Sequence, residues 1–262
     1  MLPRYLPLLA IAISLASAAH AAPPAPSPFA KTTCAGQYRY HLQGVCTNER
    51  DALYWCFTDA LVKTNVNGAV TKKIAVGNHH GDLCHHDGRL YVAVNFGRFN
   101  DDEKRADSWV YVYDADDLKL LSKHKTPELV YGAGGLANIG NRFFVVGGLP
   151  DGFKENYVYE YDAKFRFVKK HIIASGYTRL GIQTATYADG RFWFGCYGNK
   201  LLKTDAKFKL LGKYDFDCGI GIVTTGADRF LVARGSCDKE KGCNGRLLQA
   251  QPDEKLGLKL QP

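Results

Sequence analysis

The chain has 262 residues, and its 34 Lys and Arg outnumber its 26 Asp and Glu to give a net charge of +8. Such a charge could attract an anionic glycan or a nucleic acid. The basic residues are scattered and form no basic block, which favours a solvated surface and argues against a nucleic-acid partner.

The first 21 residues have the pattern of a secretory signal peptide. Arg4 precedes an apolar run from Leu6 to Leu15, and Ala19-His20-Ala21 is an A-x-A cleavage site. The apolar run is too short to span a membrane, so no membrane partner is expected after cleavage. The sequence therefore predicts a secreted or periplasmic protein whose mature chain begins near Ala22, without a lipoprotein anchor.

After a Pro-rich linker over residues 22–33, we expect one domain over residues 34–262. Its repeating feature is clearest in residues 79–96. There, alternating apolar residues lead to a turn at Asp87-Gly88 and a second apolar run begins at Leu90-Tyr91, which predicts a β-hairpin. The pattern returns four more times, and the pairs that match Leu90-Tyr91 are Leu53-Tyr54, Phe143-Phe144, Phe192-Trp193 and Phe230-Leu231.

Each repeat supplies short apolar runs separated by turns, and usually four of them. No helical periodicity of convincing length competes. Five such units of roughly 40 to 50 residues predict an all-β fold, a five-bladed β-propeller of four-stranded antiparallel blades. The alternating segment over residues 37–41 is expected to close the ring as an outer strand of the last blade, which would leave few exposed edges.

This architecture resembles the five-bladed propellers that include the plant and bacterial glutaminyl cyclotransferases and the arabinan-degrading enzymes. The resemblance covers the whole domain, and His41-Leu42-Gln43-Gly44 is similar to the start of the first blade in a cyclotransferase. It implies the propeller fold. The sequence has neither the carboxylate set of an arabinan hydrolase nor a cyclotransferase acid, so neither activity is carried over.

Eight cysteines in an exported chain predict a disulfide framework, because the compartment oxidises thiols. Cys237 and Cys243 bracket a short loop and suit a local bridge. Cys196 ends one strand and Cys218 opens the next repeat, so they are the second expected pair. The cysteines expected to form two more bridges, with their pairing left open, are Cys34, Cys46, Cys56 and Cys84.

The position nine residues before each matched pair is glycine in four repeats and Gln183 in the fourth. The glycines indicate that backbones crowd toward the axis there, so Gln183 is expected to project into space left clear elsewhere. The preceding residue is Gln43 in the first repeat and His80 in the second, whereas the fourth and fifth repeats have isoleucine. This asymmetry favours a ligand with one polar and one apolar side.

Three of these side chains could bind a divalent metal. His41, His80 and Gln183 offer two imidazoles and an amide oxygen, and Asp82 could add a carboxylate. The set resembles the His and Gln metal ligands of oligogalacturonate lyases, which are propellers with more blades. The alternative is that the histidines hydrogen-bond to backbone carbonyls at strand starts.

The loops after the second strands should reach the same face as the starts of the inner strands, where propellers usually bind ligands. Asn95 begins one such loop, which carries Arg98, and Arg234 lies on another. Arginine suits a carboxylate or sulfate on a sugar because guanidinium offers two parallel donors. Tyr131 and Tyr197 could stack on a sugar ring.

Three other residues are expected to be structural. Trp193 could also stack on a sugar, but its place in a second strand favours packing between blades. His85 and His86 precede the Asp87-Gly88 turn and are expected on the surface.

The leading functional prediction is a propeller that binds a carbohydrate, acidic in character, at the mouth of its channel. It could cleave that ligand by metal-assisted β-elimination, with His41, His80 or Tyr131 removing the proton next to the sugar carboxylate. One alternative is a binding module without catalysis, and another is a cyclotransferase-like enzyme acting on N-terminal glutamine. Since one propeller fold hosts many functions, the fold alone does not choose among them.

Overall fold

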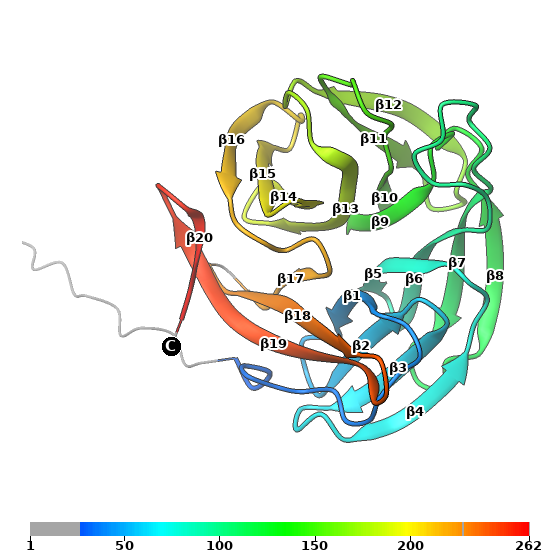
Figure 1. Ribbon diagram of the computed structural model, residues 1–262, viewed down its shortest axis with the longest axis vertical. Helices are drawn as coiled ribbons and strands as arrows, with labels where there is room; N and C mark the ends of the chain where they lie inside the picture. Colours follow the sequence, from blue (N-terminus) through cyan, green and yellow to red (C-terminus); the bar gives the residue numbers. More distant parts are fainter. Residues whose placement is uncertain (1–26, 227, 262) are drawn as a thin grey trace, which may run out of the picture.

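The computed structural model describes residues 27–226 and 228–261, so the expected signal peptide lies outside the described residues. The described chain forms five four-stranded antiparallel sheets arranged around a central axis (Figure 1). The predicted all-β five-bladed propeller is therefore confirmed. Within residues 27–226 and 228–261, no helix has the length and hydropathy needed to cross a membrane.

Each blade runs from an inner strand beside the axis to an outer strand at the rim, and blades 1 to 5 follow the chain. The inner strands are β1 (Leu42–Thr47), β5 (His80–His86), β9 (Ala133–Ile139), β13 (Arg179–Ala188) and β17 (Ile222–Thr224). The second strands are β2 (Ala52–Phe57), β6 (Arg89–Asn95), β10 (Arg142–Gly147), β14 (Arg191–Tyr197) and β18 (Phe230–Asp238). The third strands are β3 (Ala60–Asn65), β7 (Ser108–Asp114), β11 (Asn156–Tyr161), β15 (Lys200–Asp205) and β19 (Gly242–Asp253). The outer strands are β4 (Val70–Ala75), β8 (Leu120–Lys125), β12 (Phe167–Ile173), β16 (Leu210–Asp215) and β20 (Gly257–Leu260).

The core lies between the blades. Every residue of β2 is buried, whereas β4 at the rim is almost wholly exposed. Five clusters of buried apolar side chains fill the interfaces between neighbouring blades. Trp193 is 2% exposed in the cluster between blades 4 and 5, with its ring 4.9 Å from that of Phe230. The expectation that Trp193 packs in the core is therefore confirmed.

The ring closes where the N-terminal segment meets blade 5. Isolated bridges pair Thr33 with Arg246 and Tyr38 with Cys243, so the segment lies along the first half of β19. Tyr38 also stacks on Phe57 at the end of β2, with 3.8 Å between the ring centroids. The expected closure is present as these two bridges, and it ties blade 5 to blade 1.

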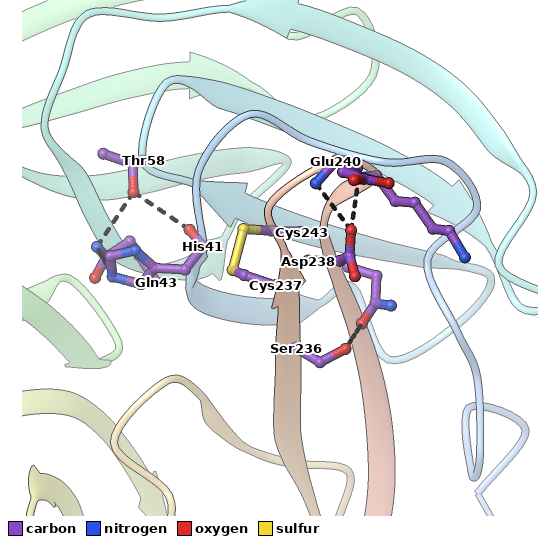
Figure 2. The surroundings of a disulfide bond; sticks show 10 residues. His41, Gln43, Thr58, Ser236, Cys237, Asp238, Glu240 and Cys243 are labelled. Carbon is purple, nitrogen blue, oxygen red and sulfur yellow. Dashed lines mark hydrogen bonds between the residues drawn. A yellow bond between two sulfur atoms is a disulfide. The ribbon is translucent and has the colours of Figure 1, made fainter.

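The Cys237–Cys243 bridge is present, with an S–S length of 2.05 Å. It joins two directly opposed residues of the β18–β19 hairpin. Figure 2 shows this hairpin beside the segment that leads into β1. The bridge therefore lies at the ring closure.

Cys196 and Cys218 are free thiols, which differs from the expected second bridge. Cys196 packs in the cluster between blades 3 and 4, whereas Cys218 packs in the cluster between blades 4 and 5. Their side chains thus lie on opposite faces of blade 4, although the two residues are neighbours across its inner end. Their positions in the repeats predicted that the two residues lie close together, but not that their side chains point to opposite faces of the blade.

The other four cysteines are also free thiols rather than two bridges. They are spread over three blade interfaces. Cys46 and Cys56 share one interface, but Cys46 is opposite Tyr54 and Cys56 is opposite Gly44 in the β1–β2 ladder. A diagonal pair of this kind is about 7 to 8 Å apart at Cα, beyond the usual reach of a disulfide.

Candidate functional site

All five inner strands begin at one face of the propeller, here called the upper face, and end at the opposite, lower face. At the upper face, the Gln43 side chain lies between two imidazole rings. Its amide nitrogen donates to Nε2 of His41 at 2.8 Å and to Nε2 of His79 at 2.7 Å. Thr58 stands beside this group and donates its hydroxyl proton to the His41 carbonyl, as Figure 2 shows. We call His41, Gln43 and His79 the upper-mouth cluster.

Both rings of the cluster are held neutral. Desolvation lowers the pKa of His79 to about 4, and the neighbouring His41 adds to this. Partial burial also lowers the pKa of His41, although part of its side chain is solvent-exposed. With the amide protons of Gln43 facing both Nε2 atoms, each ring carries its own proton on Nδ1.

His80 lies apart from this cluster, contrary to its expected place among the ligands. It is fully buried, with Nδ1 2.6 Å from the Gly77 carbonyl and Nε2 2.8 Å from the Tyr113 hydroxyl. Burial lowers its pKa to about 4. The alternative weighed for the histidines, a hydrogen bond to a backbone carbonyl at a strand start, describes His80 correctly.

The residues expected to hold a divalent metal do not assemble into a site. Both ring nitrogens of His80 have partners, and the Gln183 amide nitrogen donates to the Leu180 carbonyl at 2.7 Å. Among residues 27–226 and 228–261, no group of three His, Cys, Asp or Glu side chains is placed to hold a metal ion. The arrangement of these side chains therefore does not support the expected metal site.

Asp82 also differs from its expected role as a ligand, because its carboxyl fills the axis of the propeller. It is 1% exposed, and Oδ2 accepts a hydrogen bond from the Ala185 N–H in blade 4 at 3.1 Å. A Cβ on Gly44 would overlap it, and one on Gly135 would lie 3.0 Å from its Cβ. Burial raises the pKa of Asp82 well above its usual value, outweighing the nearby backbone N–H groups.

The glycines of the inner strands do mark a crowded axis, as expected. A Cβ on Gly81 would collide with the Gly134 carbonyl. Gln183 is half-buried next to Gly134, whose added Cβ would meet Gln183 Oε1 at 3.5 Å. The side chain that crosses the axis is nevertheless that of Asp82, and not that of Gln183.

The β6–β7 loop, residues 96–107, folds over the upper-mouth cluster. Phe99 packs edge-on against the His79 ring with 5.0 Å between centroids, and it lies against Gly132, where a Cβ would overlap it. The Asn100 N–H donates to the Tyr131 carbonyl at 3.0 Å. Two buried polar atoms in this region have no partner among the described residues, Nδ1 of His79 and Oδ1 of Asn100.

The rim holds the remaining candidates. Arg98 is exposed on the β6–β7 loop, and Tyr131 is half-buried with its ring 5.3 Å from Phe153. Arg234 is half-buried, with its Nε 3.8 Å from the Asp217 carboxylate. Tyr197 is half-buried, which raises its pKa. These side chains surround the upper face from blades 2 to 5.

Asn95, expected as a ligand-binding residue, is 1% exposed and closes the base of the β6–β7 loop. Its Oδ1 accepts from the Asp107 N–H at 2.8 Å, and its Nδ2 donates to the Gly97 carbonyl at 3.0 Å. Both functional atoms are used within the loop. The structure thus places Asn95 as a support for the loop that carries Arg98 and Phe99.

A cavity of about 300 Å³ on the axis opens at the opposite, lower face. Segments at the ends of all five inner strands line it, and His85 and His86, expected on the surface, are both half-buried in its wall. We call this space the lower cavity.

Sequence reasoning missed His79, Phe99 and Asn100. His79 precedes His80 in the sequence, and the repeat alignment assigned the ligand position to His80. The β5–β6 register shifts between His80 and Leu83, so the regular alternation used for that assignment does not extend to the start of β5. The one sequence feature that could have pointed to His79 is that two histidines, His79 and His80, stand side by side at this position.

Comparison with protein-family models finds no match, and neither does comparison with curated protein sequences. Among solved structures, the chain is similar to the glutaminyl cyclase of Myxococcus xanthus, with a TM-score of 0.56, 12% identity and coverage of 86% of this chain and 100% of that chain. It is also similar to the Pan2 WD40 domain of Neurospora crassa, with a TM-score of 0.44, 12% identity and coverage of 82% and 64%. The likeness is one of fold. The first similarity agrees with the resemblance to five-bladed propellers noted from the repeats.

Proposed function

We propose that the upper mouth of this propeller is the binding site for an acidic carbohydrate, and that the protein is exported. The observation that carries the proposal concerns the His79 ring. Gln43 donates to its Nε2, so the ring proton is on Nδ1, and this buried Nδ1 has no acceptor among the described residues. A buried donor without a partner costs about 1 to 3 kcal/mol. A ligand oxygen bound there would remove that cost.

Arg98 is the group near the cluster that best suits an anionic ligand, since Arg105 on the same loop is paired with Asp101 and Glu103 and Arg234 lies 3.8 Å from Asp217. Arg98 is exposed and Arg234 lies at the rim, whereas His41 and His79 stay neutral near pH 7 and offer hydrogen bonds without a charge of their own. Guanidinium groups bind carboxylates through two parallel hydrogen bonds. The aromatic ring of Tyr131 provides a face against which a sugar ring can stack.

The proposal is for binding and includes no metal-dependent step, because the expected ligand set is not assembled. Cleavage by β-elimination would create an unsaturated uronate that absorbs ultraviolet light. Absorbance during the binding experiment therefore tests turnover separately from binding.

Calorimetric titration with oligogalacturonates tests the proposal. The wild-type protein is expected to bind, and His79→Ala and Gln43→Leu are each expected to weaken binding at least about tenfold, since one hydrogen bond to a charged ligand contributes about 1.5 to 3 kcal/mol. His86→Ala, on the lower face, is the matched control and should bind as the wild type does. Equal affinity of His79→Ala would refute the proposal, and so would equally tight binding of neutral oligogalactosides that is lost in His79→Ala.

The likeness to a glutaminyl cyclase favours one second candidate, an enzyme that cyclises N-terminal glutamine. In that reaction the α-amine attacks the side-chain amide carbon, a C–N bond forms, and ammonia leaves. Incubation with a glutaminyl peptide and an assay for ammonia tests it, with His79→Ala as the comparison. Absence of ammonia above the uncatalysed rate would remove this candidate and leave the carbohydrate proposal untouched.

A further inference from the structure

The lower cavity is separate from the upper-mouth cluster. The Asp82 carboxyl fills the axis between Gly44 of β1 and Gly135 of β9, and the cavity lies beyond it toward the lower face. Its wall includes Cys46 and Cys84, which come two residues after Gly44 and Asp82 on the same strands. The cavity is thus a pocket with one open end and not the lower half of a continuous channel.

The volume of the lower cavity limits the size of its occupant. About 300 Å³ corresponds to roughly ten water molecules at about 30 Å³ each. This is the low end of the range for pockets that bind small molecules. The space suits one compact ligand of about the size of a monosaccharide.

Glu49, an exposed residue, is the one Asp, Glu, Lys or Arg among the described residues that line the cavity, and the rest of the wall is polar or apolar without a formal charge. Burial raises the pKa of the Cys46 and Cys84 thiols, so both stay protonated near pH 7. Burial also lowers the pKa of His85, which keeps that ring neutral. Moving an ion from water into such surroundings is costly without a charged partner, so the wall selects against charged ligands.

Several polar groups of the wall are available to a ligand. The Thr186 hydroxyl has no hydrogen bond to any described residue, and Asn138 uses only its Nδ2, which donates to the Gly140 carbonyl at 3.1 Å. His86 has Nε2 2.8 Å from Asn141 Oδ1, which leaves Nδ1 as an acceptor. Tyr187 adds an aromatic ring to the same wall.

Hydroxyl, amide and imidazole groups together match the alternating donors and acceptors of a polyol, and the tyrosine ring matches the C–H face of a sugar. We propose that the lower cavity is a second binding site, and that it takes a neutral, hydroxyl-rich ligand of monosaccharide size. This site is independent of the acidic carbohydrate proposed for the upper mouth.

Calorimetry with a panel of glucose, galactose, mannose, N-acetylglucosamine and myo-inositol tests the proposal, with glucuronate as the charged counterpart. At least one neutral member is expected to bind with a Kd in the millimolar range or tighter. In the His79→Ala variant, whose upper mouth is disabled, glucuronate is expected to bind at least tenfold more weakly than that neutral sugar. Cys84→Phe and Thr186→Phe, from two different blades, should abolish binding by filling the cavity. Cys84→Ser, which keeps the size of the side chain, should retain it.

Circular dichroism and thermal melting establish that each variant is folded. Asn138→Ala adds no bulk and is expected to weaken binding about tenfold, so it keeps the test decisive should both phenylalanine variants unfold. Binding by no member of the panel, binding that survives a folded phenylalanine variant, or binding lost in His79→Ala would each overturn the proposal. The last of these results would place the sugar at the upper mouth.

Discussion

The two ends of the propeller axis are built from the same five inner strands but differ in what lies on them. At the upper end, polar side chains bind one another and a twelve-residue loop, residues 96–107, packs Phe99 onto His79. At the lower end, two-residue turns join the inner and second strands of blades 2, 3 and 4, and a cavity of about 300 Å³ stays open. One long loop, that between β6 and β7, therefore covers the upper end, since the upper connections β2–β3 and β14–β15 are as short as the lower ones; the strands supply polar groups to both ends.

The largest expected effect that separates the two ends is loss of stability in acid, which comes from the upper half. The native pKa values of His79 and His80 are lowered to about 4, whereas the unfolded chain takes up protons near pH 6.5. The stabilisation from these rings is complete above pH 6.5 and is lost as the pH falls toward 4, by roughly 3 kcal/mol for each ring, or about 6 kcal/mol for the two together.

Urea denaturation at several pH values measures this loss. His80→Gln is expected to have a shallower decline between pH 6.5 and pH 4 than the wild type, because one of the two rings no longer titrates. The same slope in both proteins would contradict the assignment of the acid effect to His80.

Asp82 divides the two ends, and Asp82→Ala is expected to lower the free energy of unfolding by about 3 kcal/mol. The substitution leaves the Ala185 N–H without its acceptor and opens a void on the axis. Equilibrium unfolding in urea measures the change. Asp82→Asn keeps an acceptor oxygen and should cost far less, so an equal loss in both variants would contradict a bonding role.

The wild type and Asp82→Asn should also differ in how their free energy of unfolding depends on pH. The native Asp82 carboxyl keeps a proton that the unfolded chain loses above about pH 4, so its contribution to stability falls as the pH rises from there toward the raised native pKa. Asp82→Asn should remove this decline. Since His79 and His80 titrate in both proteins, the difference in stability between wild type and Asp82→Asn isolates Asp82. If this difference instead grew in favour of the wild type as the pH rises, Asp82 would be charged in the native state.

The Cys237–Cys243 bridge lies on the upper side only, beside the segment that leads to His41. Replacing both cysteines by serine is expected to lower the free energy of unfolding by about 2 kcal/mol, as the loop-entropy model gives for a short loop. Oligogalacturonate binding should also weaken. Tyr38 and Cys243 exchange backbone hydrogen bonds of 2.8 and 2.7 Å, and Tyr38 lies only three residues before His41, so the bridge helps to position the segment that carries His41. Binding of a neutral sugar at the lower cavity should not change; equal weakening at both ends would argue against a local effect.

The smallest expected effect is that of Phe99→Ala. Phe99 is half-buried on a loop, so the free energy of unfolding should fall by only about 1 kcal/mol. The His79 ring should become more accessible, and the rate of its modification by diethylpyrocarbonate, followed by mass spectrometry of the His79 peptide, should rise severalfold. An unchanged rate would mean that Phe99 does not shield the ring.

The architecture was predictable because it depends on local patterns that repeat. Alternating apolar residues and short turns recur at matched positions such as Leu90-Tyr91 and Phe192-Trp193, and each match is another instance of the same four-stranded unit. The Cys237–Cys243 bridge was predictable for a similar reason, since it closes a short hairpin. Because five repeats match, an ambiguous strand in one of them could be assigned by comparison with the other four.

The candidate site was only partly predictable, because it departs from the repeat. His41 and Gln43 were identified, but the shifted register at the start of β5 exchanged the roles of His79 and His80. Asp82 crosses to a backbone N–H of blade 4, at Ala185, about a hundred residues later in the chain. Contacts of that kind depend on how five strands meet at an axis, and no alternation within one strand specifies them.

The ring closure at blade 5 has a consequence for how the chain is made. The cluster between blades 5 and 1 joins Leu53 and Trp55 to Leu231 and Leu247, so one half is translated nearly two hundred residues before the other. Because domains are synthesised from the N-terminus, the apolar face of blade 1 has no native partner until the last blade emerges from the ribosome. Until then that apolar face stays open to non-native contacts.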